Sequence, residues 1–307
     1  MNARSTVLSS AQDQFCLLPN GIQLCYRQYG EVDRPTVLLV AGLALQLTFW
    51  PRLLIEGLIE QGYRVVVFDN RDVGRSSVGV TRPPGRLDKL LRRADPAAYD
   101  LNDMADDARG LLDHLEIGSC HVLGMSMGGM IAQTLAARHP TRVRSLTSIF
   151  SSTGARRAGQ PAMSTMLKLA RKPAQTREDA VTHHLELMRH IGPSAYTMDE
   201  HVERDYIADA WLRGAAEKTH EGVSRQMGAI IKSGNRTLAL ARIHAPTLVI
   251  HGDKDPLVAP SGGRATAKAI PGARLVTING MGHYLADGMI PHLLDLFSGH
   301  ARRSETC

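Results

Sequence analysis

A serine flanked by glycines, where a strand pattern changes into a helix pattern, leaves few folds open to this chain. Residues 124–129 read Gly-Met-Ser-Met-Gly-Gly, after a short apolar run at 120–123 and before a helical pattern at 127–138. Glycines two positions before and after the serine allow a very tight turn, with the serine strained and its hydroxyl exposed. An ordinary strand-helix turn is the alternative. The flanking elements favour a nucleophile elbow, so we predict Ser126 as a nucleophile.

Continuous apolar runs alternate with helical patterns along most of the chain. Runs without polar alternation fit strands that are covered on both faces, as in a parallel sheet. Segments at 14–18 and 22–29 alternate and predict a hairpin. The predicted sheet strands are 36–41, 64–68, 121–123, 247–250 and 274–278, and the predicted helices are 47–61, 101–115, 127–138, 262–269 and 285–297. We therefore predict an α/β fold with a mostly parallel central sheet and helices on both faces.

The alternation stops in the third quarter of the chain. That region is rich in Met, His, Arg and Glu and contains no strand-like run. A helical insertion between two sheet strands indicates a cap over the carboxyl ends of the sheet, where open α/β folds bind ligands; a separate helical domain is the alternative. The predicted parts are a core at 14–153 and 243–298, a helical cap at 154–242, and flexible ends at 1–13 and 299–307.

Composition points away from membranes and nucleic acids. No run among the 307 residues approaches the roughly 20 apolar residues that span a bilayer. The start, 1–14, lacks the apolar centre of a secretory signal, so we expect a cytoplasmic protein. The net charge of +6 is scattered, and its concentrations at 82–93, 156–157 and 302–303 contain no aromatic residues. We therefore expect no nucleic-acid partner.

The four cysteines lack the spacing of a zinc site, so we expect no metal. Asn20 and Gly21 favour a two-residue hairpin turn. Counting outward from that turn makes Cys16 and Cys25 direct cross-strand neighbours, close enough in principle for a disulfide. In a reducing cytosol we expect the two thiols to stay free.

A serine nucleophile needs a base within hydrogen-bond reach and an acid that orients the base. His283 follows the last predicted strand and a glycine-rich loop, which separates it from the other histidines as the candidate base. Asp253 and Asp255 both follow the strand at 247–250 and compete as the acid. Asp255 is favoured because it lies beyond the strand in the loop that faces the histidine, whereas Asp253 is better placed to cap the turn.

Acyl transfer also needs hydrogen-bond donors for an oxyanion. One donor in this layout is the backbone N–H of the residue after the nucleophile, Met127, at the start of a helix. The other comes from the loop after the first central strand, where Leu43 follows Gly42. We predict the N–H groups of Leu43 and Met127 as the oxyanion hole.

From about residue 15 to residue 297 the chain resembles the α/β-hydrolase fold family. The resemblance rests on the segment 124–129, on Gly-Asp-Lys-Asp at 252–255 and on Gly-His at 282–283, in that order. It implies a Ser-His-Asp hydrolase with a helical cap and no cofactor, and it also favours Asp255 as the acid.

Three further segments, 42–46, 49–51 and 68–77, are most similar to a bacterial serine esterase subgroup that includes enzymes similar to aclacinomycin methylesterase. Ala41 departs from the family pattern, because many members carry histidine there. The missing His-Gly-Gly-Pro sequence argues against a proline iminopeptidase. Ser126, where dehalogenases and epoxide hydrolases carry aspartate, argues against those reactions.

The leading hypothesis is a carboxylic ester hydrolase that forms an acyl-enzyme with a small or medium, partly apolar ester. The same site could act on a thioester, a lactone or a carbon-carbon bond, or form a peracid. A ligand-binding receptor without turnover is the alternative from another class. We expect a monomer or homodimer with a small-molecule substrate. Five methionines of the predicted cap could line an adaptable pocket or belong to its core: Met163, Met166, Met188, Met198 and Met227.

Overall fold

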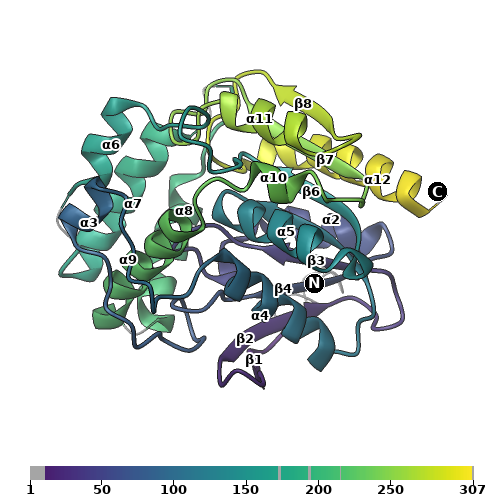
Figure 1. The fold of residues 1–307 in the computed structure, drawn as a ribbon, viewed down its shortest axis with the longest axis horizontal. Coiled ribbons are helices and arrows are strands. Elements are labelled where there is room, and N and C mark those ends of the chain that lie inside the picture. Colours follow the sequence, from purple (N-terminus) through teal and green to yellow (C-terminus); the bar gives the residue numbers. More distant parts are fainter. Residues whose placement is uncertain (1–10, 172–173, 193–194, 215, 306–307) are drawn as a thin grey trace.

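A single mixed sheet forms the centre of the molecule. The computed structural model describes residues 11–171, 174–192, 195–214 and 216–305, so the predicted flexible N-terminal segment is described only from residue 11. The sheet has eight strands in the order β1-β2-β4-β3-β5-β6-β7-β8 (Figure 1). The strands are β1 (Gln14–Leu17), β2 (Gln23–Tyr29), β3 (Thr36–Val40), β4 (Arg64–Phe68), β5 (Cys120–Met125), β6 (Val143–Ile149), β7 (Thr247–Gly252) and β8 (Arg274–Ile278). The β1–β2 and β2–β4 pairs are antiparallel and the other pairs are parallel, which confirms a mostly parallel sheet.

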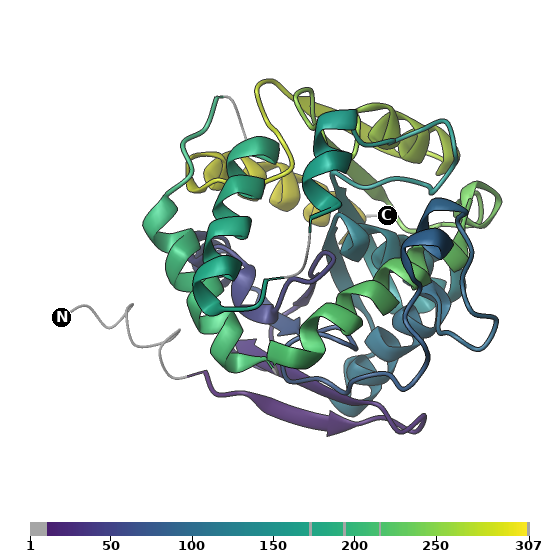
Figure 2. The same cartoon turned by 90° about the vertical axis from the view of Figure 1, so that its left-hand side faces the viewer.

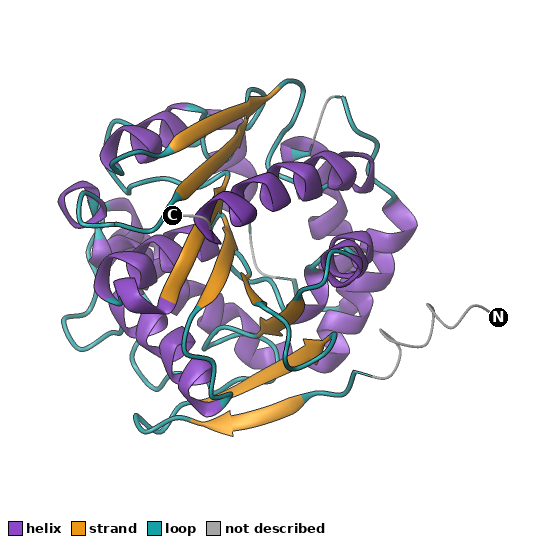
Figure 3. Cartoon of the chain, turned by 90° about the vertical axis from the view of Figure 1, so that its right-hand side faces the viewer, coloured by secondary structure: helices purple, strands orange, loops and turns teal. Residues whose placement is uncertain are grey.

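Helices cover both faces of this sheet (Figure 3). The helices are η1 (Leu47–Phe49), α2 (Arg52–Glu60), α3 (Arg86–Leu90), α4 (Leu101–His114), α5 (Met127–Arg138), η2 (Pro140–Arg142), α6 (Met163–Leu169), α7 (Arg177–Ile191), α8 (Glu200–Arg213), α9 (Ala216–Ser233), α10 (Thr237–Leu240), α11 (Ser261–Ala269), η3 (Asp287–Met289) and α12 (Ile290–Glu305). Successive strand residues point to opposite faces, so Leu38 and Val40 pack with α4 and α5, whereas Val37 and Leu39 pack with α2 and α12.

The helices α6 to α9, which we call the cap helices, lie between β6 and β7 in the chain. They gather at one end of the sheet, and Figure 2 looks onto that end. Gln46, in the loop after β3, donates through Nε2 to the Ala210 carbonyl oxygen of α8 at 2.8 Å, so the cap helices touch loops of the sheet directly. The cap boundaries at 154 and 242 stay a prediction.

Strand β6 is the strand that the apolar-run pattern did not identify. Its residues Ser145, Thr147 and Ser148 are polar but fully buried. Ser145 Oγ lies 2.8 Å from His121 Nδ1, and Ser148 Oγ accepts from Gln133 Nε2 at 2.9 Å. Side-chain hydrogen bonds therefore compensate for the burial of Ser145 and Ser148, whose polarity hides this strand from a hydrophobicity pattern.

The register of the β1–β2 hairpin differs from the prediction. Backbone hydrogen bonds close a three-residue loop, 19–21, in which Gly21 has φ 82°. The extra loop residue pairs Cys16 with Leu24 instead of Cys25. A shift of one residue turns a side chain to the other face of a sheet, so the two thiols lie in different cores and are free. The prediction that Cys16 and Cys25 are direct cross-strand neighbours is therefore wrong, whereas the expectation of free thiols is confirmed.

Helix boundaries also differ in two places. The helix predicted at 47–61 is present as two pieces, η1 and α2. The helix predicted at 285–297 starts later and continues to Glu305 as α12. For residues 299–305 the prediction of a flexible tail is wrong, because they belong to α12 and Ala301 is fully buried in the core.

Candidate active site

The turn at Ser126 has a strained backbone. Ser126 joins β5 to α5 with φ 54° and ψ −121°, a conformation that residues other than glycine rarely adopt. A Cβ on Gly124 would lie 2.3 Å from the Gly128 carbonyl oxygen, and a Cβ on Gly128 would lie 1.9 Å from the Val40 carbonyl oxygen. No side chain fits at either glycine, so the two glycines allow the turn to close and α5 to start against β3.

The structure brings the three predicted side chains together in one row. His283 Nε2 lies 2.9 Å from Ser126 Oγ, and His283 Nδ1 lies 2.7 Å from Asp255 Oδ2. The three residues follow β5, β8 and β7, so they meet at the carboxyl edge of the parallel strands. Asp255 and His283 are buried and Ser126 is half-buried.

Backbone groups hold the Asp255 carboxylate in place. Leu257 and Val258 donate their N–H groups to Asp255 Oδ1 at 2.9 and 2.8 Å. Burial would raise the pKa of Asp255, but electrostatic attraction by the His283 imidazole and hydrogen bonds from His251, His283 and Val258 outweigh it and hold the pKa well below its ordinary value. An ionised Asp255 can accept the Nδ1–H of His283, which leaves Nε2 free to take a serine proton.

The competing carboxylate, Asp253, makes a different contact. Its Oδ1 accepts the Gly280 N–H at 2.7 Å, so Asp253 fixes the turn after β8. Its side chain is half-buried, whereas Asp255 is buried. The geometry therefore pairs His283 with Asp255 and leaves Asp253 as the residue that caps the turn.

Two residues beside the row, Phe150 and Ser151, have no counterpart in the predictions. Phe150 has φ 34°, and its ring centroid lies 4.3 Å from that of His283. Ser151 Oγ donates to the Ser126 carbonyl oxygen at 2.8 Å. Both follow β6, so a strand assignment at 143–149 would have placed them at the same sheet edge as the other site residues.

The loop after β3 lies against the elbow. A Cβ on Gly42 would lie 3.3 Å from Ser126 Cβ. Ala44 has φ 65°, and its N–H donates to a glutamine side chain of α9 at 3.0 Å. Leu43 is therefore fixed from both sides, and Met127 is the first residue of α5, where N–H groups have no partner inside the helix. That these two N–H groups bind an oxyanion stays a prediction.

The cap helices contact the loop that carries His283. The His283 N–H donates to the Ile191 carbonyl oxygen at the end of α7, at 2.6 Å. A Cβ on Gly282 would lie 2.2 Å from a carbonyl oxygen just after α7. Tyr284 OH donates to Glu203 Oε1 of α8 at 2.6 Å. His283 and the residue after it are thus both hydrogen-bonded to the cap helices, and the residue before it passes close to the end of α7.

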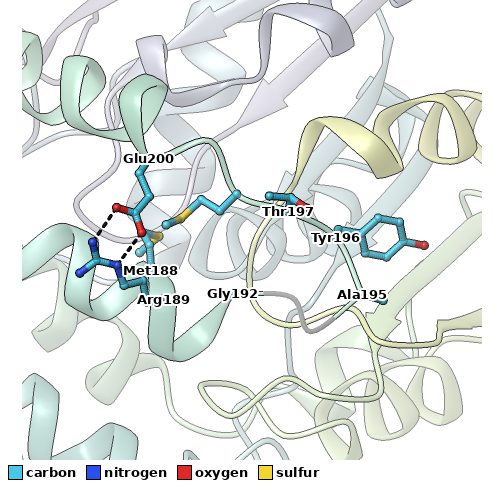
Figure 4. A pocket seen from close by; sticks show the side chains of 8 residues that line it. Met188, Arg189, Gly192, Ala195, Tyr196, Thr197 and Glu200 are labelled. Atoms are coloured by element: carbon cyan, nitrogen blue, oxygen red, sulfur yellow. Dashed lines mark hydrogen bonds and ion pairs between the residues drawn. The ribbon is translucent and has the colours of Figure 1, made fainter.

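A cavity of 390 Å³ lies between the end of α7 and the start of α8 (Figure 4). Arg189 and Glu200 face each other at this cavity through two hydrogen bonds of 2.6 Å. Met188 and Met198 are the two cap methionines that line it, whereas Met163 is exposed on α6. The three residues of the Ser126 row are not among the lining residues, so this cavity is separate from the row.

Two features are absent from the ranges that the structure describes. No helix there is both long and apolar enough to cross a membrane. In the same ranges, no cluster of three or more His, Cys, Asp or Glu side chains is arranged to hold a metal ion.

The fold and the site define a class of protein. A family model described as alpha/beta hydrolase fold matches residues 35–287, so the chain belongs to the α/β-hydrolase fold family. The resemblance inferred from the sequence is therefore confirmed.

Individual relatives narrow the class to hydrolases. The rhodomycin D methylesterase DnrP of Streptomyces peucetius is 30% identical over 89% of this chain and 93% of its own length. A putative carbamate hydrolase, RutD of Pseudomonas syringae pv. syringae, is 28% identical over 82% of this chain and 88% of its own length. The crystal structure of the enol-lactonase from Burkholderia xenovorans LB400 matches with a TM-score of 0.67 and 24% identity, covering 96% of this chain and 100% of that chain. The chain is thus a hydrolase with relatives of the esterase type.

Proposed function

We propose that this protein is a serine hydrolase of carboxylic esters. The observation that carries the proposal is the hydrogen-bonded row in which His283 contacts Ser126 at 2.9 Å and Asp255 at 2.7 Å. Ser126 is the nucleophile, His283 the general base, and Asp255 the acid that orients the imidazole. The strained turn at Ser126 supports the assignment, because strain of this kind is concentrated at functional sites.

The first half of the reaction forms an acyl-enzyme. Ser126 Oγ attacks the ester carbonyl carbon while His283 Nε2 takes the hydroxyl proton. The N–H groups of Leu43 and Met127 bind the oxyanion of the tetrahedral intermediate. The intermediate collapses when the bond to the alcohol oxygen breaks, and His283 returns the proton to the departing alcohol.

The second half regenerates the enzyme. Water takes the place of the alcohol, and His283 Nε2 removes a proton from it as it attacks the acyl carbon. The second tetrahedral intermediate releases Ser126 Oγ, which recovers the proton from His283. The products are a carboxylic acid and an alcohol, and the reaction consumes only the ester and one water molecule.

The substrate class follows from the relatives. The Streptomyces relative is named for the methyl ester of rhodomycin D, and we extend this to a small or medium methyl ester of a partly apolar acid for this chain. A lactone or a carbamate also presents an electrophilic carbonyl carbon to Ser126, so its hydrolysis would use the same residues.

The test compares wild type with Ser126→Ala on p-nitrophenyl esters from acetate to decanoate, and on rhodomycin D. We expect repeated turnover by wild type and a fall in kcat of about 10⁶-fold, or to the detection limit, in the variant. Ser298→Ala is a matched control because it removes another serine hydroxyl. Ser298 lies on α12, and its hydroxyl donates to Gln61 Oε1 at 2.6 Å. Equal turnover by wild type and Ser126→Ala would refute the proposal, and a single burst without turnover would favour a receptor.

A further inference from the structure

The carbonyl oxygen of the predicted nucleophile carries a hydrogen bond from outside its own helix. Ser151 Oγ donates to the Ser126 carbonyl oxygen at 2.8 Å. A Cβ on Gly129 would lie 2.7 Å from Ser151 Cβ. Glycine at position 129 therefore allows the Ser151 hydroxyl to reach the elbow, which gives the third glycine of the motif a physical reason.

The Ser126 carbonyl and the Met127 N–H belong to one planar peptide unit. A donor on the oxygen of an amide draws electron density toward that oxygen and makes the N–H at the other end a stronger donor. The Met127 N–H is the group that we propose for the oxyanion, so the Ser151 hydroxyl contacts the far end of the same peptide.

The Ser151 hydroxyl is in turn the near end of a buried polar chain. Gln133 of α5 is fully buried, and its Nε2 donates to Ser148 Oγ at 2.9 Å and, in a longer contact, to Ser151 Oγ at 3.5 Å. Gln133 Oε1 accepts from Arg236 Nη2 at 3.1 Å. Arg236 stands between α9 and α10, so the chain runs from the end of the cap helices to the elbow.

The Arg236 guanidinium is buried, and no carboxylate among the described residues pairs with it. Its Nη2 also donates to the Ser152 carbonyl oxygen at 2.7 Å, but Nε and Nη1 have no hydrogen-bond partner among the described residues. Burial lowers the pKa of Arg236 to about 10, so the side chain stays charged at neutral pH. A buried cation without a counter-charge reduces stability, and an unsatisfied buried group of this kind calls for an explanation in function.

We propose that Arg236, Gln133 and Ser151 are positioning residues that polarise the Ser126–Met127 peptide and strengthen its N–H toward the oxyanion. This inference rests on the proposed function, because it requires Ser126 to form a tetrahedral intermediate. The positive charge of Arg236 orients the Gln133 amide, that amide orients the Ser151 hydroxyl, and the hydroxyl acts on the peptide. Burial of the Arg236 charge thus lowers the stability of the fold, while the same charge stabilises the transition state through the Met127 N–H.

The test measures kcat, KM and melting temperature for Ser151→Ala and Arg236→Met, together with the rate at which a fluorophosphonate labels Ser126. Removal of a whole oxyanion donor costs about 100-fold in kcat or more. Weakening a donor should lower kcat less than removing it. We therefore expect kcat to fall about 10-fold in Ser151→Ala and about 3-fold in Arg236→Met, with KM unchanged. We expect the melting temperature of Arg236→Met to equal or exceed that of wild type, which is the opposite of a purely structural contribution.

Thr134→Val is the matched control. Thr134 Oγ1 donates to the Met130 carbonyl oxygen at 2.8 Å, a contact of the same kind on the same helix that does not touch the Ser126–Met127 peptide. If Ser151→Ala retains the kcat of Thr134→Val, or if its loss lies in KM, the inference is overturned. Fluorophosphonate labelling separates the two proposals: slower labelling of Ser151→Ala in a protein without ester turnover refutes the esterase and supports the polarised peptide. Wild type that neither labels nor turns over refutes both.

Discussion

Asp253 and Asp255 show how two identical side chains in one loop acquire different properties. Asp255 is buried and receives two backbone N–H groups on one oxygen and His283 on the other. Asp253 is half-buried and receives the Gly280 N–H. The surroundings lower the pKa of Asp255, so only Asp255 is fixed as an anion beside the imidazole.

Asp255→Asn is therefore expected to lower kcat by about 10⁴-fold while the protein stays folded. The backbone N–H groups on Oδ1 would hold the amide oxygen of Asn on their side and turn its NH₂ group toward His283 Nδ1. The imidazole would then carry its proton on Nε2 and could not accept the Ser126 proton. Steady-state kinetics on a p-nitrophenyl ester measures the loss.

Asp253→Asn is the control for that substitution. Asparagine keeps an oxygen for the Gly280 N–H, so kcat should stay within about 3-fold of wild type, as for a substitution outside the reacting groups. A large fall in kcat for Asp253→Asn together with a small fall for Asp255→Asn would show that Asp253, and not Asp255, orients the imidazole.

At the scale of elements, helix α8 holds the loop that carries His283. Glu203 of α8 accepts from Tyr284 OH, and its second oxygen lies 2.6 Å from His184 Nε2 of α7. Tyr284 and Tyr206 both place their rings edge-on to Phe49, with centroids 6.5 and 5.1 Å away. The Tyr284 hydroxyl therefore adds a contact to a carboxylate that ring packing alone does not provide.

Tyr284→Phe should lower kcat about 5-fold and also lower the melting temperature, because a buried hydrogen bond to a charged group contributes roughly 1.5–3 kcal/mol. Removing the hydroxyl leaves the buried Glu203 carboxylate with His184 as its one partner in the described ranges and frees the residue next to His283. Tyr206→Phe is the matched variant: it keeps the ring on Phe49 and loses, among the described residues, the 3.3 Å hydrogen bond from the Gln46 N–H. Similar kinetics for the two variants would show that the Tyr284 hydroxyl does not position the base.

The sequence predicted the elements whose signal is local. Five strands have continuous apolar runs, and the elbow carries its own glycines, so Ser126 could be found from one segment. The predictions of His283 and Asp255 used their places after such strands, and the choice of Asp255 over Asp253 also used the resemblance to the family. Strand β6 could not be found in this way, because Ser145, Thr147 and Ser148 are buried despite being polar, and the hydrogen-bond partners of Ser145 and Ser148 come from other elements.

Features that depend on how distant elements meet were also out of reach. The hairpin register depended on one loop residue, so a two-residue turn gave a wrong neighbour for Cys16. The contact of Glu203 with Tyr284 joins positions 81 residues apart, and that of Arg236 with Gln133 joins positions 103 apart. No local pattern in a single sequence encodes such a pair.

At the scale of the whole molecule, one arginine ties the N-terminal segment, the sheet loops and the cap helices together. Arg213 at the end of α8 donates to Asp13 Oδ2 at 3.0 Å, to Gln46 Oε1 at 2.9 Å and to Asp69 Oδ2 at 2.6 Å. Asp13 precedes β1, Gln46 follows β3 and Asp69 follows β4. The cap helices are thus anchored to three separate parts of the chain through one side chain.

Asp13 supplies the pH dependence of this anchor. Burial would raise the pKa of Asp13, but hydrogen bonds from Arg75 and Arg27 and the charge of Arg213 outweigh it and lower the pKa to about 2. The ordinary value of 3.8 applies to the unfolded chain. A carboxyl with a lower pKa in the folded state stabilises the fold above pH 4 or so, and this contribution disappears as the pH falls through 2.

Asp13→Asn should therefore lower the free energy of unfolding by about 2 kcal/mol at pH 7, since each pKa unit corresponds to about 1.4 kcal/mol. The difference between wild type and variant should shrink steadily as the pH falls from about 4 to about 2, because the Asp13 carboxyl of the unfolded wild-type chain then takes up a proton before that of the folded chain does. Urea unfolding at several pH values measures it. Glu31→Gln is the control: its pair with Arg34 is exposed to solvent, so this substitution should leave the free energy of unfolding at pH 7 close to that of wild type. A pH-independent difference for Asp13→Asn would mean that lost packing, and not the charge of Asp13, holds the N-terminal segment to the cap helices.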